Sequence, residues 1–312
     1  MKKAILFFTV ASLFCFSCKK DHSPAPKPTD KTYKINFNVS DFDAVVTNST
    51  DSKLKVNGLT TNAITPVAGY LDVLYYYIFD SSGKQLHYLT QDSTATNFGN
   101  ITDNLPAGTY TVAIAAGKKG LMVGYLYMMG YTNGNNNNSG IPGPFIPWND
   151  TFFNEFTLTV SGGDITQNVT LNRIVGQLEL DVLDAIPVNA NTISIVVNPE
   201  DEFYQFSGSS TIPLSPSVYQ TTYTRTLTIP NAAKGTSTYK SVPIIIGNVA
   251  TSFTVSISCY DASQKLLGSA IVTNVSCQKN TRTILSGHLF GRNNGFSITL
   301  NPWNPATVTI PF

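Results

Sequence analysis

The sequence predicts an all-β protein built from β-sandwiches, and three observations support this prediction. Apolar and polar side chains alternate along segments such as Tyr33–Ser40, which is the two-residue period of a half-buried strand. No stretch of about 12 residues or more shows a clean helical period. Short apolar segments separated by polar turns recur along the chain, which is typical of β-sandwiches. A mature chain of about 280 residues exceeds one comfortable core, so we expect two sandwiches in tandem.

The first element along the chain is an export signal. Two lysines follow the initial methionine, residues 4–16 are predominantly apolar, and a serine precedes Cys18. This order is typical of a signal peptide, and the apolar run is shorter than the ~20 residues that a membrane-spanning helix needs. Residues 13–18 resemble a bacterial lipobox, in which the cysteine is acylated and becomes the mature N-terminus. We therefore expect residues 1–17 to be a lipoprotein signal peptide and Cys18 to be the lipidation site. An ordinary cleaved signal with an incidental cysteine is the alternative.

The second element, residues 18–31, is expected to be a lipidated, proline-rich linker. It carries Pro24, Pro26 and Pro28 and no large apolar side chain after the cysteine. Such a composition favours an extended, semi-rigid spacer over a packed core. Acyl chains such as palmitate, at about 0.8 kcal/mol per buried CH₂, would hold the chain on a membrane. The predicted partner of this end of the protein is therefore a lipid bilayer.

Residues 32–172 are expected to form the N-terminal sandwich. Both faces of Leu71–Phe79 are apolar, which predicts a central strand covered on each side, and Asp80–Lys84 is expected to turn the chain into a hairpin. Residues 131–150 are rich in Asn, Gly and Pro, so we predict a loop without regular structure there. Gly120–Gly130 fits a short helix or a strand equally well. The strands predicted in this half are Tyr33–Ser40, Leu71–Phe79, Gln85–Thr90, Thr109–Ala116 and Phe152–Val160.

Residues 173–312 are expected to form the C-terminal sandwich in the same style. Asp261–Gln264 is predicted to be the turn of a hairpin. The strands predicted in this half are Ile174–Val182, Thr192–Asn198, Tyr223–Ile229, Val242–Gly247, Phe253–Tyr260, Leu266–Thr273, Thr281–Leu289, Phe296–Leu300 and Ala306–Ile310.

The charge balance excludes one class of partner. The whole chain has a net charge of +1, and removal of the signal takes away two lysines and no acid, which leaves about −1 at pH 7. No block of Lys and Arg occurs in the sequence. We therefore expect no nucleic-acid partner, because the basic footprint that phosphates require is missing.

Few residues suit catalysis or metal binding. The chain has three histidines and lacks His-x-x-x-His, Cys-x-x-Cys, EF-hand, Gly-x-Ser-x-Gly and P-loop patterns. A catalytic triad assembled in space stays open for any sequence. The carboxylates of Asp41 and Asp43 and of Glu200–Glu202 are interpreted as solvated strand or loop positions, with a weak cation site as the alternative. We expect a non-enzymatic protein without cofactor or metal.

Two cysteines and two tryptophans complete the candidate residues. An exported location permits a disulfide between Cys259 and Cys277, but the expected hairpin places Cys259 opposite about Leu266, so free thiols are the alternative. Trp148 and Trp303 lie in Pro- and Asn-rich segments. They could form an aromatic platform for a glycan, or they could pack against the protein. The platform would make the chain a surface glycan-binding lipoprotein of a polysaccharide-uptake system, which is our alternative function.

Three segments of the chain resemble the fimbrillin superfamily of Bacteroidota, the subunits and anchor lipoproteins of type V pili. The first is the hairpin Leu71–Leu89 with the strand entry Leu105–Val112. The second is Phe152–Leu178, with an arginine between apolar residues. The third is Asn280–Gly287 with Phe296–Trp303. The resemblance implies two transthyretin-like sandwiches and a lipid-anchored protein of the cell outer membrane, exposed at the surface, which acts in adhesion.

The resemblance also implies a mode of assembly. Shaft subunits of this superfamily lose their first strand by cleavage after an arginine, and a strand of another fimbrial subunit fills the groove. This chain has no arginine before Arg173, so we expect the strand Tyr33–Ser40 to be retained. Cleavage at a lysine, such as Lys53 or Lys55, is the alternative. A retained first strand favours an anchor, a terminating subunit or a separate surface protein over a polymerising shaft subunit.

Overall fold

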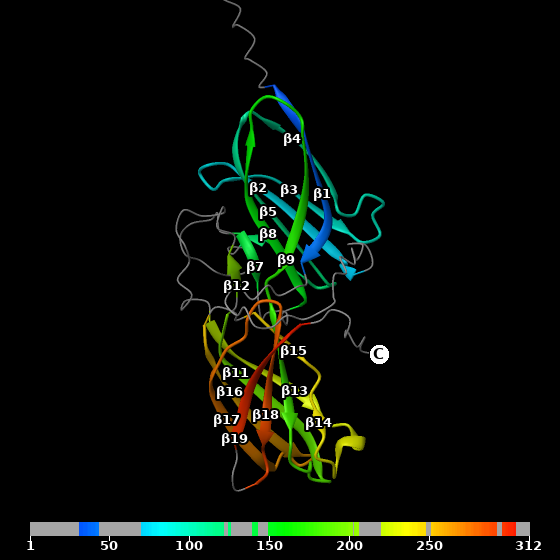
Figure 1. Cartoon of the computed structure of the whole chain (residues 1–312), viewed down its shortest axis with the longest axis vertical. Helices are drawn as coiled ribbons and strands as arrows, with labels where there is room; N and C mark the ends of the chain where they lie inside the picture. The colour runs from blue at the N-terminus through cyan, green and yellow to red at the C-terminus, as the bar shows by residue number, and fades with distance from the viewer. Residues whose placement is uncertain are drawn as a thin grey trace, which may run out of the picture. The chain divides into compact units, whose positions relative to one another are not determined.

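The structure is a computed structural model, in which Thr32–Phe312 forms one compact unit (Figure 1). Among the residues that it describes, no helix is long and apolar enough to cross a membrane. The described residues are 31–43, 70–121, 124–125, 139–142, 149–201, 203–205, 220–247, 251–291 and 295–303.

Seven strands from the first half of the chain form one sheet in the order β3-β2-β5-β8-β9-β1-β4. Neighbours β8 and β9 meet only at Phe152↔Arg173 and Phe153↔Asn172. The sheet therefore folds over at this point, and strands from both ends of the path enclose one apolar core. The strands are β1 (Thr32–Asp43), β2 (Val73–Phe79), β3 (Gln85–Asp92), β4 (Asn100–Pro106), β5 (Gly108–Gly117), β8 (Thr151–Val160) and β9 (Ile165–Arg173).

Strand β2 is covered on both faces, as its unbroken apolar sequence predicts. Tyr76 and Ile78 belong to the core enclosed by the folded sheet. Tyr77 and Phe79 point the other way into a second apolar cluster, which also contains Trp303. Successive side chains of a strand alternate between faces, so only a strand with two buried faces tolerates this run of residues.

The second half of the chain forms two sheets around a separate core. One sheet has the order β14-β10-β18-β19, with β15 also paired to β10, and the other has the order β13-β11-β16-β17. The all-β sandwich fold is thus confirmed, whereas a domain boundary between residues 172 and 173 stays a prediction. The strands are β10 (Gly176–Val182), β11 (Ala190–Asp201), β13 (Gln220–Thr228), β14 (Tyr239–Lys240), β15 (Ile244–Ile246), β16 (Phe253–Asp261), β17 (Leu266–Val275), β18 (Thr281–His288) and β19 (Gly295–Pro302). The predicted strand Ala306–Ile310 lies outside the described residues.

A third, small sheet corrects the prediction for the Asn-rich segment. It contains β6 (Gly124–Tyr125), β7 (Ser139–Pro142) and β12 (Phe203–Gln205) in the order β12-β7-β6. Strand β7 lies inside residues 131–150, where we expected no regular structure. Its partner β12 is far away in the sequence, so local composition gives no sign of the pairing. Strand β6 settles the helix-or-strand alternative of Gly120–Gly130 in favour of a strand at its two residues.

Two hairpin turns use the same device in the two halves of the chain. Asp80 Oδ1 accepts hydrogen bonds from the backbone N–H groups of Ser82 (2.9 Å) and Lys84 (3.1 Å). In the β16–β17 turn, Asp261 Oδ1 accepts the equivalent bonds from Ser263 (2.8 Å) and Lys265 (3.0 Å). An aspartate that binds the backbone two residues ahead is a turn signal, which confirms both turn predictions.

Gln264 is the weak point of the second turn, and its replacement by glycine should stabilise the protein. Gln264 has a φ of 63°, whereas Gly83 holds the matching position of the first turn at 79°. A residue with a Cβ atom pays about 1–2 kcal/mol in the left-handed region. After subtraction of the backbone entropy of glycine, we expect Gln264→Gly to gain about 0.5–1 kcal/mol in urea unfolding. Gly83→Ala should do the opposite, and a loss of stability in Gln264→Gly would contradict the argument.

Asp184 ties the segment after β10 to the end of β18. Its carboxylate accepts hydrogen bonds from the backbone N–H groups of Leu289 and Phe290 (2.8 Å for Phe290) and lies 2.7 Å from His288 Nδ1. Burial disfavours the ionised carboxylate, but the bonds from Phe290, His288 and Leu289 outweigh it and lower the pKa of Asp184.

This lowered pKa predicts a pH-dependent effect of Asp184→Asn. Because the carboxylate is held ionised in the folded state, its contribution is complete above the unfolded pKa of about 3.9 and is lost as the pH falls through the lower folded value. We expect Asp184→Asn to lower Tm at neutral pH and the difference from wild type to shrink at acidic pH. Thermal unfolding over a pH series measures this. A difference that is constant with pH would mean that the charge is irrelevant.

Candidate functional site

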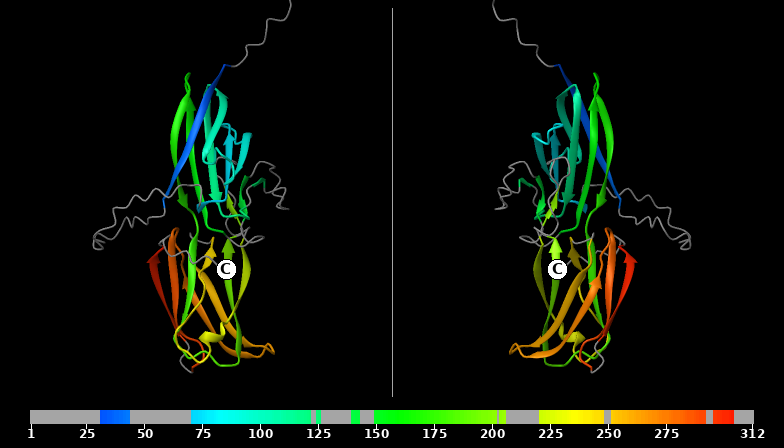
Figure 2. Two further views of the ribbon diagram at one scale, coloured as in Figure 1. Left: turned by 90° about the vertical axis from the view of Figure 1, so that its right-hand side faces the viewer. Right: turned by 90° about the vertical axis from the view of Figure 1, so that its left-hand side faces the viewer.

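The first candidate site is β1, which lies between two strands rather than at an edge. It pairs antiparallel with β4 from Thr32 to Asn38 and parallel with β9 from Ile35 to Asp43. Figure 2 shows β1, in blue, crossing this part of the sheet obliquely. Thr32 is the first residue of the strand, so the chain that follows the predicted tether enters the fold directly through β1.

Alternate side chains of β1 are part of the core. Ile35 and Phe37 are fully buried and Val39 is 4% exposed. The Phe37 ring centroid lies 5.9 Å from that of Tyr76 and 5.7 Å from that of Phe156, which are typical aromatic contacts. The prediction of a half-buried strand at Tyr33–Ser40 is therefore confirmed.

The polar groups of β1 form hydrogen bonds with side chains of neighbouring segments. The Lys34 backbone N–H donates to Asp164 Oδ1 at 2.9 Å. Asn36 Oδ1 accepts a hydrogen bond from Thr102 Oγ1 of β4 at 3.0 Å, and Asn38 Nδ2 donates to Asn168 Oδ1 of β9 at 3.2 Å. Side chains on β1 thus repeat the connections that its backbone makes to both neighbours.

The second candidate site is a buried ionic centre around Arg173, at the end of β9. The side chain is completely buried, its Nε donates to Asp150 Oδ1 at 2.7 Å, and one terminal nitrogen (Nη2) donates to Asp150 Oδ2 at 3.1 Å. Tyr70 donates its hydroxyl hydrogen to Asp150 Oδ2 at 2.5 Å. Burial, followed by the neighbouring Asp150 charge, raises the pKa of Tyr70, so this hydroxyl stays protonated.

Arg173 also joins residues that are far apart in the sequence. Its other terminal nitrogen (Nη1) donates to Asn280 Oδ1 at 2.5 Å. The guanidinium carbon lies 3.9 Å from the ring centroid of Trp303 and 4.8 Å from that of Phe152. This is a cation–π arrangement in a desolvated setting. The centre therefore connects β8 and β9 with the segments before β18 and after β19.

The structure gives different outcomes for the tryptophans and cysteines that the sequence analysis selected. Trp303 is only 3% exposed and stacks on Arg173, so of its two interpretations packing against the protein holds and the glycan platform does not. Trp148 and the predicted lipidation site Cys18 lie outside the described residues. Cys259 and Cys277 are buried free thiols, so the structure holds no disulfide between them. Cys259 lies opposite Gly268 in the β16–β17 hairpin, two positions from the Leu266 that we expected.

The two free thiols are poorly suited to act as nucleophiles. Burial raises the pKa of each to about 11. Cys277 Sγ also lies 3.3 Å from Thr283 Oγ1. Buried thiols with raised pKa values pack as small apolar groups rather than act as nucleophiles.

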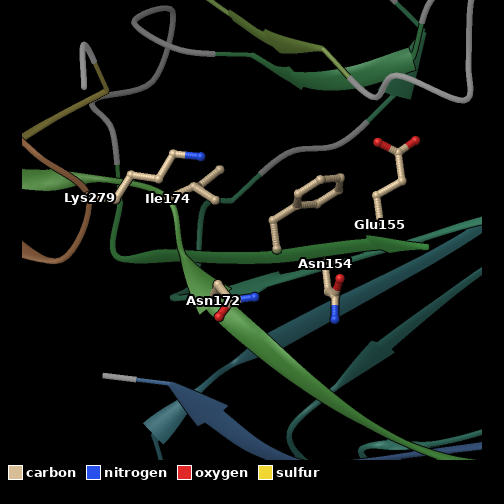
Figure 3. Close-up of a pocket in the computed structure, with 6 residues that line it drawn as sticks. Asn154, Glu155, Asn172, Ile174 and Lys279 are labelled. Atoms are coloured by element: carbon tan, nitrogen blue, oxygen red, sulfur yellow. The ribbon is translucent and has the colours of Figure 1, made fainter. Parts of the chain in front are cut away.

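The fork where β8 and β9 separate contains a pocket of about 300 Å³ (Figure 3). Lys279 and Glu155 extend to the same side of the strand ribbons as Ile174, whereas Asn154 and Asn172 extend to the other side. Burial lowers the pKa of Lys279. No group of three or more His, Cys, Asp and Glu residues that could hold a metal occurs in the described parts of the chain. The pocket is lined by Phe153, Asn154, Glu155, Asn172, Ile174 and Lys279.

Sequence reasoning missed the partners of Arg173 and the pocket. The sequence signal for Arg173 was weak, because an arginine between apolar residues also fits the solvated face of an alternating strand. Asp150 and Asn280 are 23 and 107 residues away from it. Nothing in the sequence shows that these side chains meet.

The sequence and the structure were compared with known proteins. No curated protein matches the sequence. Similar solved structures include a candidate polysaccharide-binding protein of Bacteroides thetaiotaomicron, with 11% identity over 87% of this chain and 96% of that one and a TM-score of 0.49. The fimbrial anchor protein Mfa2 of Porphyromonas gingivalis has 12% identity over 88% of this chain and 98% of its own, with a TM-score of 0.47. The tip fimbrial protein Mfa3 of the same organism has 10% identity over 88% and 100%, with a TM-score of 0.43.

The family comparison is the informative one. Those structural similarities all have TM-scores below 0.5 and identities near 10%, so they carry no functional information about this chain. The profile of one family matches residues 148–308, which is more than half of the chain and includes Asp150, Arg173, Asn280 and Trp303. The chain belongs to the family of unknown function DUF6562.

Proposed function

We propose that this chain is a non-enzymatic, lipid-anchored surface protein of the outer membrane that serves as an anchor or terminal subunit of a fimbria-type assembly. The observation that carries the proposal is β1, a doubly paired inner strand at the start of the folded unit. The predicted lipid on Cys18 and the linker that follows it lead directly into this strand.

An inner first strand is suited to bear load from a membrane tether. Interstrand hydrogen bonds lie roughly across the strand direction, so a pull on Thr32 along β1 shears them together rather than opening them one at a time. Seven residue pairs with β4 and eight with β9 share the load.

The same geometry relates β1 to strand complementation. Loss of β1 would leave ladder groups of β4 and β9 unpaired and would open the core where Ile35, Phe37 and Val39 lie. A donated strand from another subunit would fill such a groove by β-augmentation. In this chain the sequence before Arg173 offers no arginine for cleavage, so we propose that β1 stays in place with its tether.

The mature N-terminus of the protein from native membranes tests this proposal. Intact-mass analysis should give a chain that begins at acylated Cys18 and still contains residues 32–43, and Cys18→Ser should abolish acylation. A mature chain that begins after Asp43 would make this protein a groove-bearing shaft subunit instead. A freely soluble chain without lipid would remove the anchor altogether. The buried Trp303 offers no exposed ring face for a glycan.

A further inference from the structure

Strand β19 forms an edge of the second half that lacks the usual protection. Among the described residues it pairs only with β18, over eight residue pairs and without a register shift. Its sequence, GFSITLNP, contains no charged side chain, and its one proline stands at the last position. Natural sheet edges are normally blunted by charges, prolines, bulges or short length, because an open ladder pairs readily with another strand.

Other edge strands of this protein carry such protection. Strand β3 has His87 and a register shift opposite Ile78 and Phe79. Strand β17 has two register shifts in its pairing with β16, and β13 has Arg225 and a shift between Val197 and Glu200. The regular, uncharged ladder of β19 is therefore a departure from the pattern of its own fold.

Two apolar side chains on the core-facing side of β19 are partly exposed. Residues directly opposite each other on antiparallel strands point to the same face. Ile298 lies opposite Leu285 and Leu300 lies opposite Thr283, and both of these β18 side chains are buried in the core. Ile298 and Leu300 thus belong to the core-facing side, yet they are 40% and 43% exposed.

We infer that β19 is the site where a second copy of this chain adds to the sheet, antiparallel and with its two-fold axis at Ile298. In this register Ile298 faces Ile298 of the second copy and Phe296 faces Leu300. On the outer face Ser297 meets Thr299, so each pair matches apolar with apolar or hydroxyl with hydroxyl. The absence of charge from the strand means that two copies meet without repulsion.

The order of side chains along β19 is suited to a second copy of the chain. A two-fold contact requires a surface that is complementary to itself, and the apolar positions 296, 298 and 300 are symmetric about their centre. The paired edge would also cover the exposed parts of Ile298 and Leu300. The inference is independent of the proposed anchor function, because it uses no residue of β1 or of the tether.

Cysteine cross-linking of the full-length protein in intact cells tests the register. Opposite residues of antiparallel strands have Cα atoms about 4.5–5.5 Å apart, which is within the range for a disulfide. We expect Ile298→Cys to give a disulfide-linked dimer at least about tenfold faster than Ile271→Cys. Ile271 is the matched control, because it lies on the edge strand β17 of the same half and is 70% exposed.

A second pair of variants covers the case in which Ile298→Cys does not fold. Ser297→Cys and Thr299→Cys, coexpressed, should cross-link with each other faster than either does with itself. Equal rates for Ile298→Cys and Ile271→Cys would overturn the inference. A cross-link from position 298 to a protein of different mass would also overturn it, since the occupant of the edge would then be another chain.

Discussion

Replacement of Arg173 by alanine should lower the free energy of unfolding by about 3–5 kcal/mol, which is the usual cost of leaving one partner of a buried ion pair alone. The variant keeps Asp150, which is 8% exposed, without its cation. It also removes the donor to Asn280 and the cation between the rings of Phe152 and Trp303. Urea unfolding measures the loss.

The size of this effect comes from desolvation rather than from the number of contacts. In the unfolded chain the guanidinium makes similar hydrogen bonds with water. The ion pair therefore makes only a modest net contribution to the free energy of unfolding while both partners remain. Once Arg173 is removed, Asp150 retains only its hydrogen bond from Tyr70 in a poorly hydrated site. Arg173→Lys should recover only part of the stability. An ammonium cannot reproduce the planar set of hydrogen bonds that the guanidinium donates to Asp150, Tyr70 and Asn280.

An exposed ion pair provides the control for this prediction. Lys240 Nζ lies 3.5 Å from Asp181 Oδ2 and the Lys240 side chain is 62% exposed, so Lys240→Ala should cost clearly less than Arg173→Ala. The double variant Arg173→Met with Asp150→Leu should be more stable than Arg173→Ala, because no buried charge remains without a partner. Equal losses for Arg173→Ala and Lys240→Ala would show that the burial of Arg173 has no special weight.

The fold was largely predictable because strands and turns leave local signals. Alternation identified β1, and a run that is apolar on both faces identified β2 as a doubly covered strand. Asp80 and Asp261 predicted the two hairpin turns, because aspartate side chains accept hydrogen bonds from the backbone of a turn. Strands β4 and β9 were not predicted, and the sequence of β4, NITDNLP, has few apolar residues.

The sites were less predictable because they depend on meetings between distant segments. Trp303 carries no sign that an arginine 130 positions earlier will stack on it, so the sequence left an exposed ring and a packed ring as alternatives. The pairing of β7 with β12 likewise joins two segments whose compositions look like loops. Periodicity reports which face of one segment is buried, but it does not report what buries that face.

Truncation of Phe37 to alanine should cost about 3–5 kcal/mol and should weaken the first strand more than any polar change on it. The ring is fully buried between Tyr76 and Phe156, so its removal leaves a cavity lined by two aromatic side chains. Residues on both sides of β1 are held by backbone ladders, which limits how far the structure can close the cavity. Chemical unfolding of the variant gives the loss directly.

Two controls separate burial on β1 from the type of residue removed. Lys34→Ala changes an exposed position of the same strand and should stay within about 0.5 kcal/mol of wild type. Phe296→Ala removes the same ring from the half-buried edge strand β19 and should cost less than Phe37→Ala. If Phe37→Ala were no more costly than Phe296→Ala, β1 would be a loosely held strand. The tension that we propose to enter at Thr32 would then act on a strand that separates easily, and the anchor function would lose its physical basis.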